Sequence, residues 1–368
     1  DQQFMDLMGS PYLIAHGMGV PVSDAVTTVD IGSGGTYHVY VRTYNWTSPW
    51  SAKPGAGAFE VSVGGKRLRT VGQTGNRWQW QKAGTVRLKA GATQLRLHDL
   101  TGFDGRCDAI LLTTDGSLVP PDYASSQDVF RSGINGTSLE PRDAGNYDMV
   151  VVGAGIAGMS AAVSAARLGL RVALIGDRPV AGGNNSSEVR VHMGGRLGVG
   201  PYPKLGQLQQ EFAPCREGNA QPAAYYEDQK KMQWLQQEHG VSLFMGVHAD
   251  GVTMDGTRIE SITARNVLSG ERLRFRAQLY ADCTGDATIG YLAGADWRMG
   301  RESRSEYGES RAPERADSLT MGASVQWYAA ESKSRERFPL FEYGVVLNDS
   351  TAERVLKGEW TWETGMNR

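Results

Sequence analysis

The stretch YDMVVVGAGIAGMSAAVSAARLG, residues 147–169, decides the fold of the second half of the chain. Residues 149–166 within it carry no charged side chain, and by length alone they approach a membrane span. Glycine and alanine dominate the stretch, however, and leucine, isoleucine and phenylalanine are sparse. The pattern therefore predicts a buried strand, a glycine turn and a helix that ends at Gly169, and no transmembrane segment is expected.

Three glycines follow the strand with the spacing G-x-G-x-x-G. We expect Gly153 to permit the turn, Gly155 to let the backbone approach a pyrophosphate, and Gly158 to let the helix pack closely on the sheet. The phosphates would lie at the helix N-terminus, beside Ile156 and Ala157, where free N–H groups favour anions.

A second buried strand, LRVALIG at residues 170–176, completes a β–α–β unit and strengthens the prediction of dinucleotide binding. The acidic residue that binds the ribose in such units is expected at position 176, which is glycine here. Asp177 and Arg178 come directly afterwards. Two interpretations stay open: Asp177 and Arg178 contact the cofactor, or Asp177 is a solvated loop residue paired with Arg178.

Two later segments favour FAD over NAD. RPVAGGNNSSEVRV, residues 178–191, combines glycines that let the backbone pass a flat ligand with polar side chains that offer hydrogen bonds. LYADCTGDATIGYLAGA, residues 279–295, is an apolar strand that breaks into T-G-D, where an aspartate can accept hydrogen bonds from ribityl hydroxyls. Besides the residues named above, the expected FAD contacts are Gly182, Gly183, Asn184, Ser186, Ser187, Val247, Thr284, Gly285 and Asp286.

The segment before the glycine motif has a different periodicity. Residues 35–46, 57–68, 84–91 and 93–100 alternate apolar and polar side chains between glycine-containing turns. We therefore predict a multidomain fold. An antiparallel β-sandwich at 1–118 is followed by a linker at 119–146, which is rich in Pro, Gly, Ser and Asp and has room for one short helix. An α/β Rossmann-like FAD-binding domain follows at 147–368. A β meander is inserted in the last domain, which ends in the start of a substrate region.

Composition excludes several other classes of protein. The 368 residues are 40% hydrophobic and 21% charged, as in ordinary globular proteins, and a formal net charge of −2 gives no reason to expect a nucleic-acid partner. Cys107, Cys215 and Cys283 are far apart in the sequence, so neither a disulfide framework nor a metal site is expected. No signal peptide is visible, and the sequence is compatible with a homo-oligomer.

With these motifs, the chain resembles FAD-dependent oxidoreductases of the glutathione-reductase and fumarate-reductase type. Within them it is similar to a bacterial group marked by GGNNSSEVRV, ADCTGD and AGADWRMGRESRSEYGE. Residues 1–118 resemble a golvesin or xanthan-lyase-associated carbohydrate-binding-like module, through YHVYVRTYNWTSPW, RWQWQKAGTVRLKAG and LHDLTGFDGRCDAILLTT. The resemblance implies an FAD-bound redox enzyme of glycan metabolism, in the periplasm or outside the cell, with the cytoplasm as the alternative.

Members of that group extend further at both ends. A stretch before DQQFM supplies an early strand, and a segment beyond WTWETGMNR returns to the flavin domain and covers the isoalloxazine. We therefore expect this chain to be truncated at both ends and its flavin domain to be incomplete at the C-terminus.

Flavin chemistry requires a group that manages a proton, and histidine is the usual type. His192 follows the 178–191 segment and is the candidate acid or base, against a structural histidine as the alternative. Arg190 and Arg196 flank it and are candidates to bind a carboxylate or stabilise reduced flavin, against salt bridges at a sheet edge. Arg301, Glu302 and Glu306 are candidates to border a substrate cavity, in a segment that otherwise reads as solvated surface.

Tryptophans in the first domain offer faces on which sugars stack, namely Trp46, Trp50, Trp78 and Trp80, against a purely structural or docking role for this module as the alternative. The leading hypothesis is an FAD-dependent oxidoreductase that transfers hydride from a carbohydrate or other hydroxylated small molecule to flavin. The alternatives are a fumarate-reductase-type enzyme acting on a small carboxylic acid, and a non-catalytic glycan-binding protein that keeps the flavin fold as a scaffold.

Overall fold

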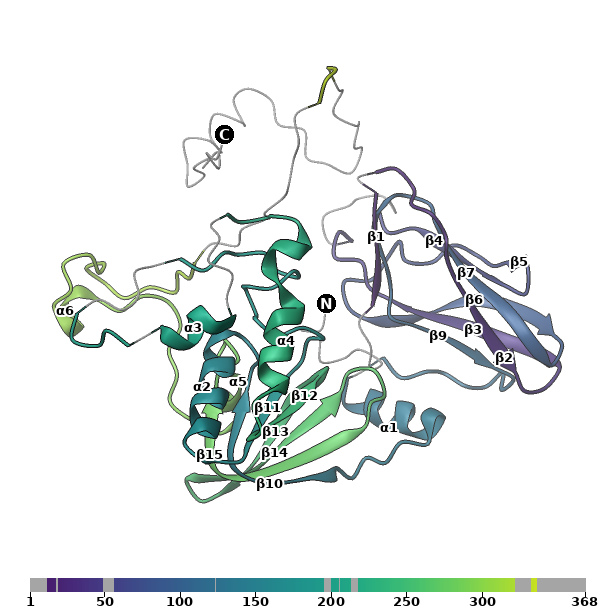
Figure 1. Ribbon diagram of the computed structural model, residues 1–368. Helices are drawn as coiled ribbons and strands as arrows, with labels where there is room; N and C mark the ends of the chain where they lie inside the picture. The colour runs from purple at the N-terminus through teal and green to yellow at the C-terminus, as the bar shows by residue number, and fades with distance from the viewer. Residues whose placement is uncertain are drawn as a thin grey trace. The chain divides into compact units, whose positions relative to one another are not determined.

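The computed structural model describes residues 12–17, 19–48, 56–122, 124–194, 200–204, 206–212, 218–321 and 332–335 (Figure 1). The chain forms two compact units that divide after Asp122. Each unit has a core of its own. Among the described residues, no helix is both long and apolar enough to cross a membrane.

The first unit is built from antiparallel strands. They are β1 (Leu13–His16), β2 (Ala25–Ile31), β3 (Gly35–Thr43), β4 (Phe59–Val63), β5 (Lys66–Arg67), β6 (Gln79–Leu88), β7 (Gly91–Asp99), β8 (Phe103–Cys107) and β9 (Ala109–Thr113). They pair into a four-stranded sheet in the order β2-β7-β4-β5, a three-stranded sheet β6-β3-β9 and a two-stranded sheet β1-β8.

One hydrophobic core receives side chains from the two larger sheets. Val61 and Val63 of β4 enter it from the four-stranded sheet, and Val39 and Val41 of β3 enter it from the three-stranded sheet. All four are fully buried. The period-two alternation in the sequence reflects this arrangement, because successive strand residues point to opposite faces.

The tryptophans of this unit differ in exposure. Trp78 is only 3% exposed, and its ring lies 5.0 Å from that of Tyr12 and 5.6 Å from that of Tyr44, between centroids. A ring so enclosed presents no face to a sugar. Trp46, in contrast, is 37% exposed, and Trp50 lies outside the described residues.

The second unit contains one six-stranded sheet and several helices. Its strands are β10 (Arg142–Val152), β11 (Val172–Gly176), β12 (Val241–Met245), β13 (Val247–Asp255), β14 (Arg258–Asn266) and β15 (Arg272–Asp282). Its helices are α1 (Ala124–Asn135), α2 (Ile156–Arg167), α3 (Gln207–Phe212), α4 (Asp228–Gln236), α5 (Thr288–Leu292) and α6 (Arg304–Tyr307), with a 3₁₀ turn η1 at Ala223–Tyr226.

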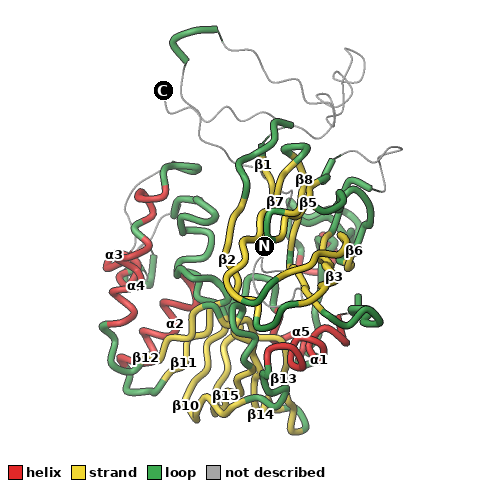
Figure 2. The backbone as a smooth tube through the Cα atoms, turned by 90° about the vertical axis from the view of Figure 1, so that its right-hand side faces the viewer, coloured by secondary structure: helices red, strands yellow, loops and turns green. Residues whose placement is uncertain are grey.

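The sheet has the order β12-β11-β10-β15-β14-β13. The first four strands are parallel to one another, and β13, β14 and β15 pair antiparallel as a meander. Figure 2 shows α2, α3 and α4 on one side of the sheet and α5 on the other. Val151 and Leu174 pack towards α2 and α4, whereas Val150 and Ile175 pack towards the meander. The apolar run of β10 is continuous because both of its faces are buried.

The segment 119–146 contains the short helix that the linker prediction allowed for, and also the start of a strand that was not predicted there. Helix α1 occupies its middle, and β10 already begins at Arg142 and pairs with β15 from Arg142↔Leu273 onwards. This early part of β10 is polar because it pairs with β15 alone, whereas Met149–Val152 also pair with β11 and are enclosed. Hydrophobic patterning therefore revealed only the second half of the strand.

Candidate functional site

The turn between β10 and α2 is closed by backbone contacts. Gly153 has φ +103°, and a Cβ on it would lie 2.2 Å from the carbonyl oxygen of Cys283. A Cβ on Gly158 would lie 1.8 Å from the carbonyl oxygen of Gly153. Only glycine fits at these two positions, because the helix, the turn and the end of β15 are in direct backbone contact.

Gly155 is placed differently. It is the N-cap of α2, no side chain caps this helix end, and the nearest atom to a Cβ built on it is the Cα of Gly183, at 3.9 Å. Gly155 and Gly182 form an isolated parallel bridge, and the Gly182 amide donates to the Ala154 carbonyl at 2.8 Å. Two glycine segments thus form a cradle without side chains at the start of a helix.

A cavity of about 890 Å³ opens over this cradle. That volume falls in the usual range for sites of small molecules and cofactors. Residues predicted to contact a cofactor line it in large number, namely Gly153, Gly155, Ile156, Ala157, Asp177, Arg178, Gly182, Gly183, Asn184, Val247, Thr284, Gly285 and Asp286. The fold therefore brings the ends of β10, β11 and β15 and the start of β13 to one cavity, although they are far apart in sequence.

Asp177 follows β11 directly and lines the cavity. Its Oδ2 lies 3.8 Å from Nδ1 of His248, and this contact lowers the pKa of Asp177 below its ordinary 3.8. Arg178 is paired with Glu188 and not with Asp177, since its Nη1 donates to Oε2 of Glu188 at 2.9 Å. Asp177 is therefore an ionised acceptor at the cavity wall.

The T-G-D turn depends on an aspartate that the sequence reasoning passed over. Asp282 Oδ1 accepts hydrogen bonds from the amide and hydroxyl of Thr284, at 3.0 and 2.7 Å, and its Oδ2 accepts from the amides of Ile289 and Gly290. Partial burial raises the pKa of Asp282, but these hydrogen bonds outweigh it and lower the pKa overall. The D-C-T-G-D pattern contained the signal, since an aspartate two residues before a threonine commonly closes such a turn.

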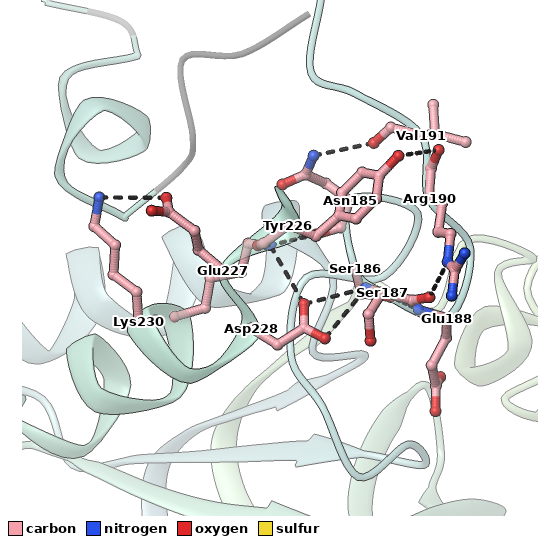
Figure 3. A network of polar contacts seen from close by, with 11 residues as sticks. Asn185, Ser186, Ser187, Glu188, Arg190, Val191, Tyr226, Glu227, Asp228 and Lys230 are labelled. Atoms are coloured by element: carbon pink, nitrogen blue, oxygen red, sulfur yellow. Dashed lines mark hydrogen bonds and ion pairs between the residues drawn. The ribbon is translucent and has the colours of Figure 1, made fainter. Parts of the chain in front are cut away.

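Of the described residues predicted to contact FAD or to take part in catalysis, four do not line the cavity. Gly158 packs under the turn, and Ser186 is fully buried. The Ser187 amide donates to the Asp228 carboxylate at 3.2 Å, and Arg190 Nε donates to the Ser187 carbonyl at 2.9 Å (Figure 3). Ser187 and Arg190 therefore take part in hydrogen bonds that shape the loop. Arg196 lies outside the described residues.

Asn185 is the centre of that loop and was not predicted. Its Nδ2 donates to the Val191 carbonyl at 3.0 Å, and the side chain is buried while the residue lines the cavity (Figure 3). Lys231 of α4, also fully buried, donates to the carbonyl oxygens of Asn185 and Tyr226. Burial lowers the pKa of this ammonium more than the nearby Asp228 raises it. No local pattern in the sequence announces such a contact between segments.

His192 lines the same cavity, just beyond the loop. Its backbone amide donates to Oδ1 of Asn219 at 2.9 Å, and its Nδ1 lies 2.6 Å from the same oxygen. Arg301, in contrast, pairs with Asp317, Glu306 pairs with Arg298, and neither these residues nor Glu302 line the cavity. Of the described residues predicted to act in catalysis or to border a substrate cavity, His192 is therefore the one that lines the cavity over the glycine cradle.

The cavity fits a dinucleotide. The start of α2 offers backbone N–H groups to a pyrophosphate, the cradle at Gly155 and Gly183 leaves room for its close approach, and Asp177 offers a carboxylate to ribose hydroxyls. These features define a dinucleotide-binding α/β unit as the class of protein.

Comparison with protein families then identifies the particular family. Residues 148–359 match the family described as FAD dependent oxidoreductase. The match covers more than half of the chain, and the chain belongs to this family. Its cofactor is FAD, as predicted, and the protein is an FAD-dependent oxidoreductase.

Solved structures give more distant likenesses. A family 35 carbohydrate binding module from an environmental isolate is 23% identical over 33% of this chain and 86% of that chain, with a TM-score of 0.25. The quinol fumarate reductase subunit FrdA of E. coli is 16% identical over 39% and 33%, with a TM-score of 0.30. THI4 of Thermovibrio ammonificans is 20% identical over 46% and 76%, with a TM-score of 0.31.

At these scores the likenesses carry no functional argument. The chain spans about a third of the fumarate reductase subunit that it matches. No curated protein matches the chain.

Proposed function

We propose that the protein oxidises a hydroxyl-bearing small molecule, a carbohydrate being the leading class. When bound, FAD supplies the hydride acceptor. Gly155, Gly183 and the start of α2 would hold its pyrophosphate, Asp177 its ribose, and Thr284 and Asp286 would lie along its ribityl chain. His192 accepts the hydroxyl proton as the neighbouring carbon loses hydride. The observation that supports this most is that His192 lines the cavity that also contains the glycine cradle.

A second candidate, oxidation or reduction of a small carboxylic acid, requires a guanidinium positioned for the carboxylate. In the described part of the cavity wall, Arg178 is the arginine present, and it is paired with Glu188. The side chain of Arg190 is directed to the carbonyl of Ser187. We therefore favour a hydroxylated substrate.

The proposal is tested by anaerobic titration of the FAD-loaded, full-length protein. We expect its visible flavin absorption to bleach on addition of sugars and not of small carboxylates. Bleaching by carboxylates alone would overturn the substrate class. A colourless protein that refuses added FAD but is retained on a glycan column would overturn the redox role in favour of the scaffold alternative.

We further propose that the first unit is a β-sandwich of the carbohydrate-binding-like type, and that it keeps the enzyme on its glycan. The shared core of the two larger sheets supports the architecture, and the exposed Trp46 supports a stacking role. Glycan retention by the full chain, lost in Trp46→Ala and kept in Trp78→Phe, is the expected result. We also propose export to the periplasm or beyond, which fractionation of the source cells tests.

A further inference from the structure

His192 and Asn219 are joined at two points through one oxygen. Asn219 Oδ1 accepts the backbone N–H of His192 at 2.9 Å and lies 2.6 Å from Nδ1 of the imidazole. The two segments are also pinned together by backbone, since the Ala220 amide donates to the Arg190 carbonyl at 2.9 Å. Tyr226 Oη donates to the same carbonyl at 2.6 Å, so the pairing is fixed from both sides (Figure 3).

The first of these contacts settles which way the Asn219 amide faces. The oxygen and nitrogen of an asparagine side chain are assigned from their partners, and a backbone N–H can only donate. The Asn219 atom that meets it must therefore be the oxygen. This oxygen has no hydrogen to give.

The orientation of the amide in turn fixes the imidazole. Nδ1 of His192 faces an oxygen that can only accept, so Nδ1 carries the proton. In the neutral ring, Nε2 then has the lone pair. Among the described residues, Nε2 has no hydrogen-bond partner, and the side chain lines the cavity.

We propose that Asn219 is a positioning residue that holds His192 as the Nδ1–H tautomer, with Nε2 presented as the proton acceptor. Free neutral histidine prefers the opposite tautomer, so the contact selects the form that accepts a proton at Nε2. The catalytic meaning of this tautomer rests on the proposed function, whereas the tautomer itself does not. An orienting group behind a base is the arrangement by which many enzymes fix the direction of proton transfer.

The tautomer is tested by NMR on the ¹⁵N-histidine-labelled, full-length holoenzyme at a pH where the ring is neutral. Two-bond ¹H–¹⁵N correlations distinguish the two tautomers, and His192→Gln assigns the signal by its loss. We expect the Nδ1–H pattern in the wild type and in Asn219→Asp, which keeps an acceptor. We expect Nε2–H in Asn219→Leu. Gln221→Leu, which removes an amide from the same loop, is the matched control and keeps the wild-type pattern.

Flavin reduction by a bleaching sugar gives the second measurement. Asn219→Leu should slow it by about 10–100-fold, by analogy with the loss on removing a partner that orients a metal-bound histidine. Asn219→Asp should restore most of the rate. An Nε2–H wild type overturns the inference, even where Asn219→Leu fails to fold. If the wild type shows Nδ1–H but His192→Ala reduces its flavin normally, the positioning stands and the proposed function fails.

Discussion

His98 in the first unit and His192 in the second are both held at Nδ1 by a side-chain oxygen. For His98 the partner is Asp24 Oδ1 at 2.9 Å, and its Nε2 lies 2.7 Å from Oγ of Ser62. Serine, histidine and aspartate at these distances have the connectivity of a hydrolase triad. In the part of the chain that the structure describes, His192 has a single hydrogen-bonding side-chain partner, Asn219. Its Nε2 has no partner among the described residues, and its side chain lines the cavity.

The surroundings of Ser62 and His98 nevertheless argue against a catalytic role for them. Ser62 lies within β4, is 6% exposed, and pairs with Arg67 of β5 and Arg96 of β7 in the sheet. Neither Ser62 nor His98 lines the large cavity. Both ring nitrogens of His98 are used to tie three chain segments together, so it is structural. A histidine is a candidate base when one ring nitrogen is available at a cavity. The number of polar groups linked to the ring does not show whether it is catalytic.

The sharpest way to break this comparison is to remove each ring. His192→Ala should slow flavin reduction by a bleaching sugar by about 10²–10⁴-fold, the usual contribution of a general base. His98→Ala should leave that rate unchanged. Stopped-flow reduction under anaerobic conditions measures both, and equal losses in the two variants would contradict the comparison.

A second comparison sets a glycine of the cradle, Gly155, against a glycine of the first unit, Gly32. Gly155→Val would place a branched side chain in the cradle over which the pyrophosphate is proposed to pass. The nearest atom to its Cβ is the Cα of Gly183 at 3.9 Å, which is an ordinary van der Waals contact. We expect FAD affinity to fall on the order of 100-fold, equivalent to about 2.7 kcal/mol. Gly32→Val is the matched control in the first unit, because nothing lies within 4 Å of its Cβ. Isothermal titration with FAD that gives equal affinities for the two variants would argue against the cradle.

Stability should rank the histidines in the opposite order. His98→Ala removes the side-chain partner of the buried Ser62 hydroxyl and one partner of Asp24, which keeps its ion pair with Arg96. The free energy of unfolding should fall by about 1–3 kcal/mol, the cost of leaving a buried polar group unpaired. His192→Ala should cost less, since only the ring contact with Asn219 is lost. Urea denaturation compares them. A larger loss for His192→Ala would show that this residue is structural as well.

The smallest effect is expected at Asp177. Asp177→Asn should weaken FAD binding by about tenfold or less, as for one hydrogen bond to a ribose, whereas Glu188→Gln should not.

The pKa of Asp177 is lowered in the folded state, so its contribution to stability is present above its ordinary value of 3.8 and is lost as the pH falls through the lower, folded value. Acid unfolding of Asp177→Asn should lack this step. If the acid-unfolding profile of Asp177→Asn matched that of the wild type, the contact between Asp177 and His248 would not be the cause of this loss of stability.

The elements that could be predicted from the sequence are those whose own residues carry a distinct pattern. The β–α–β unit around Gly153, Gly155 and Gly158 is present as predicted, and FAD as the cofactor is confirmed by the family match. Within the linker predicted at 119–146, the start of β10 at Arg142 was missed, because this part of the strand is polar and has no apolar pattern. The suggestion that Trp78 stacks on a sugar was also wrong, because Tyr12 and Tyr44 enclose it.

The sequence by itself thus determined the elements whose physics is local. A glycine turn between an apolar run and a small-residue helix forms a strand–turn–helix unit. The free N–H groups at the start of its helix favour a phosphate, because this property belongs to the unit itself. Only the tertiary structure decided which distant groups meet there. Asn219 reaches His192, and Lys231 reaches the carbonyl of Asn185, through contacts between loops. Such contacts depend on where the sheet and helices place the loops, which no periodicity records.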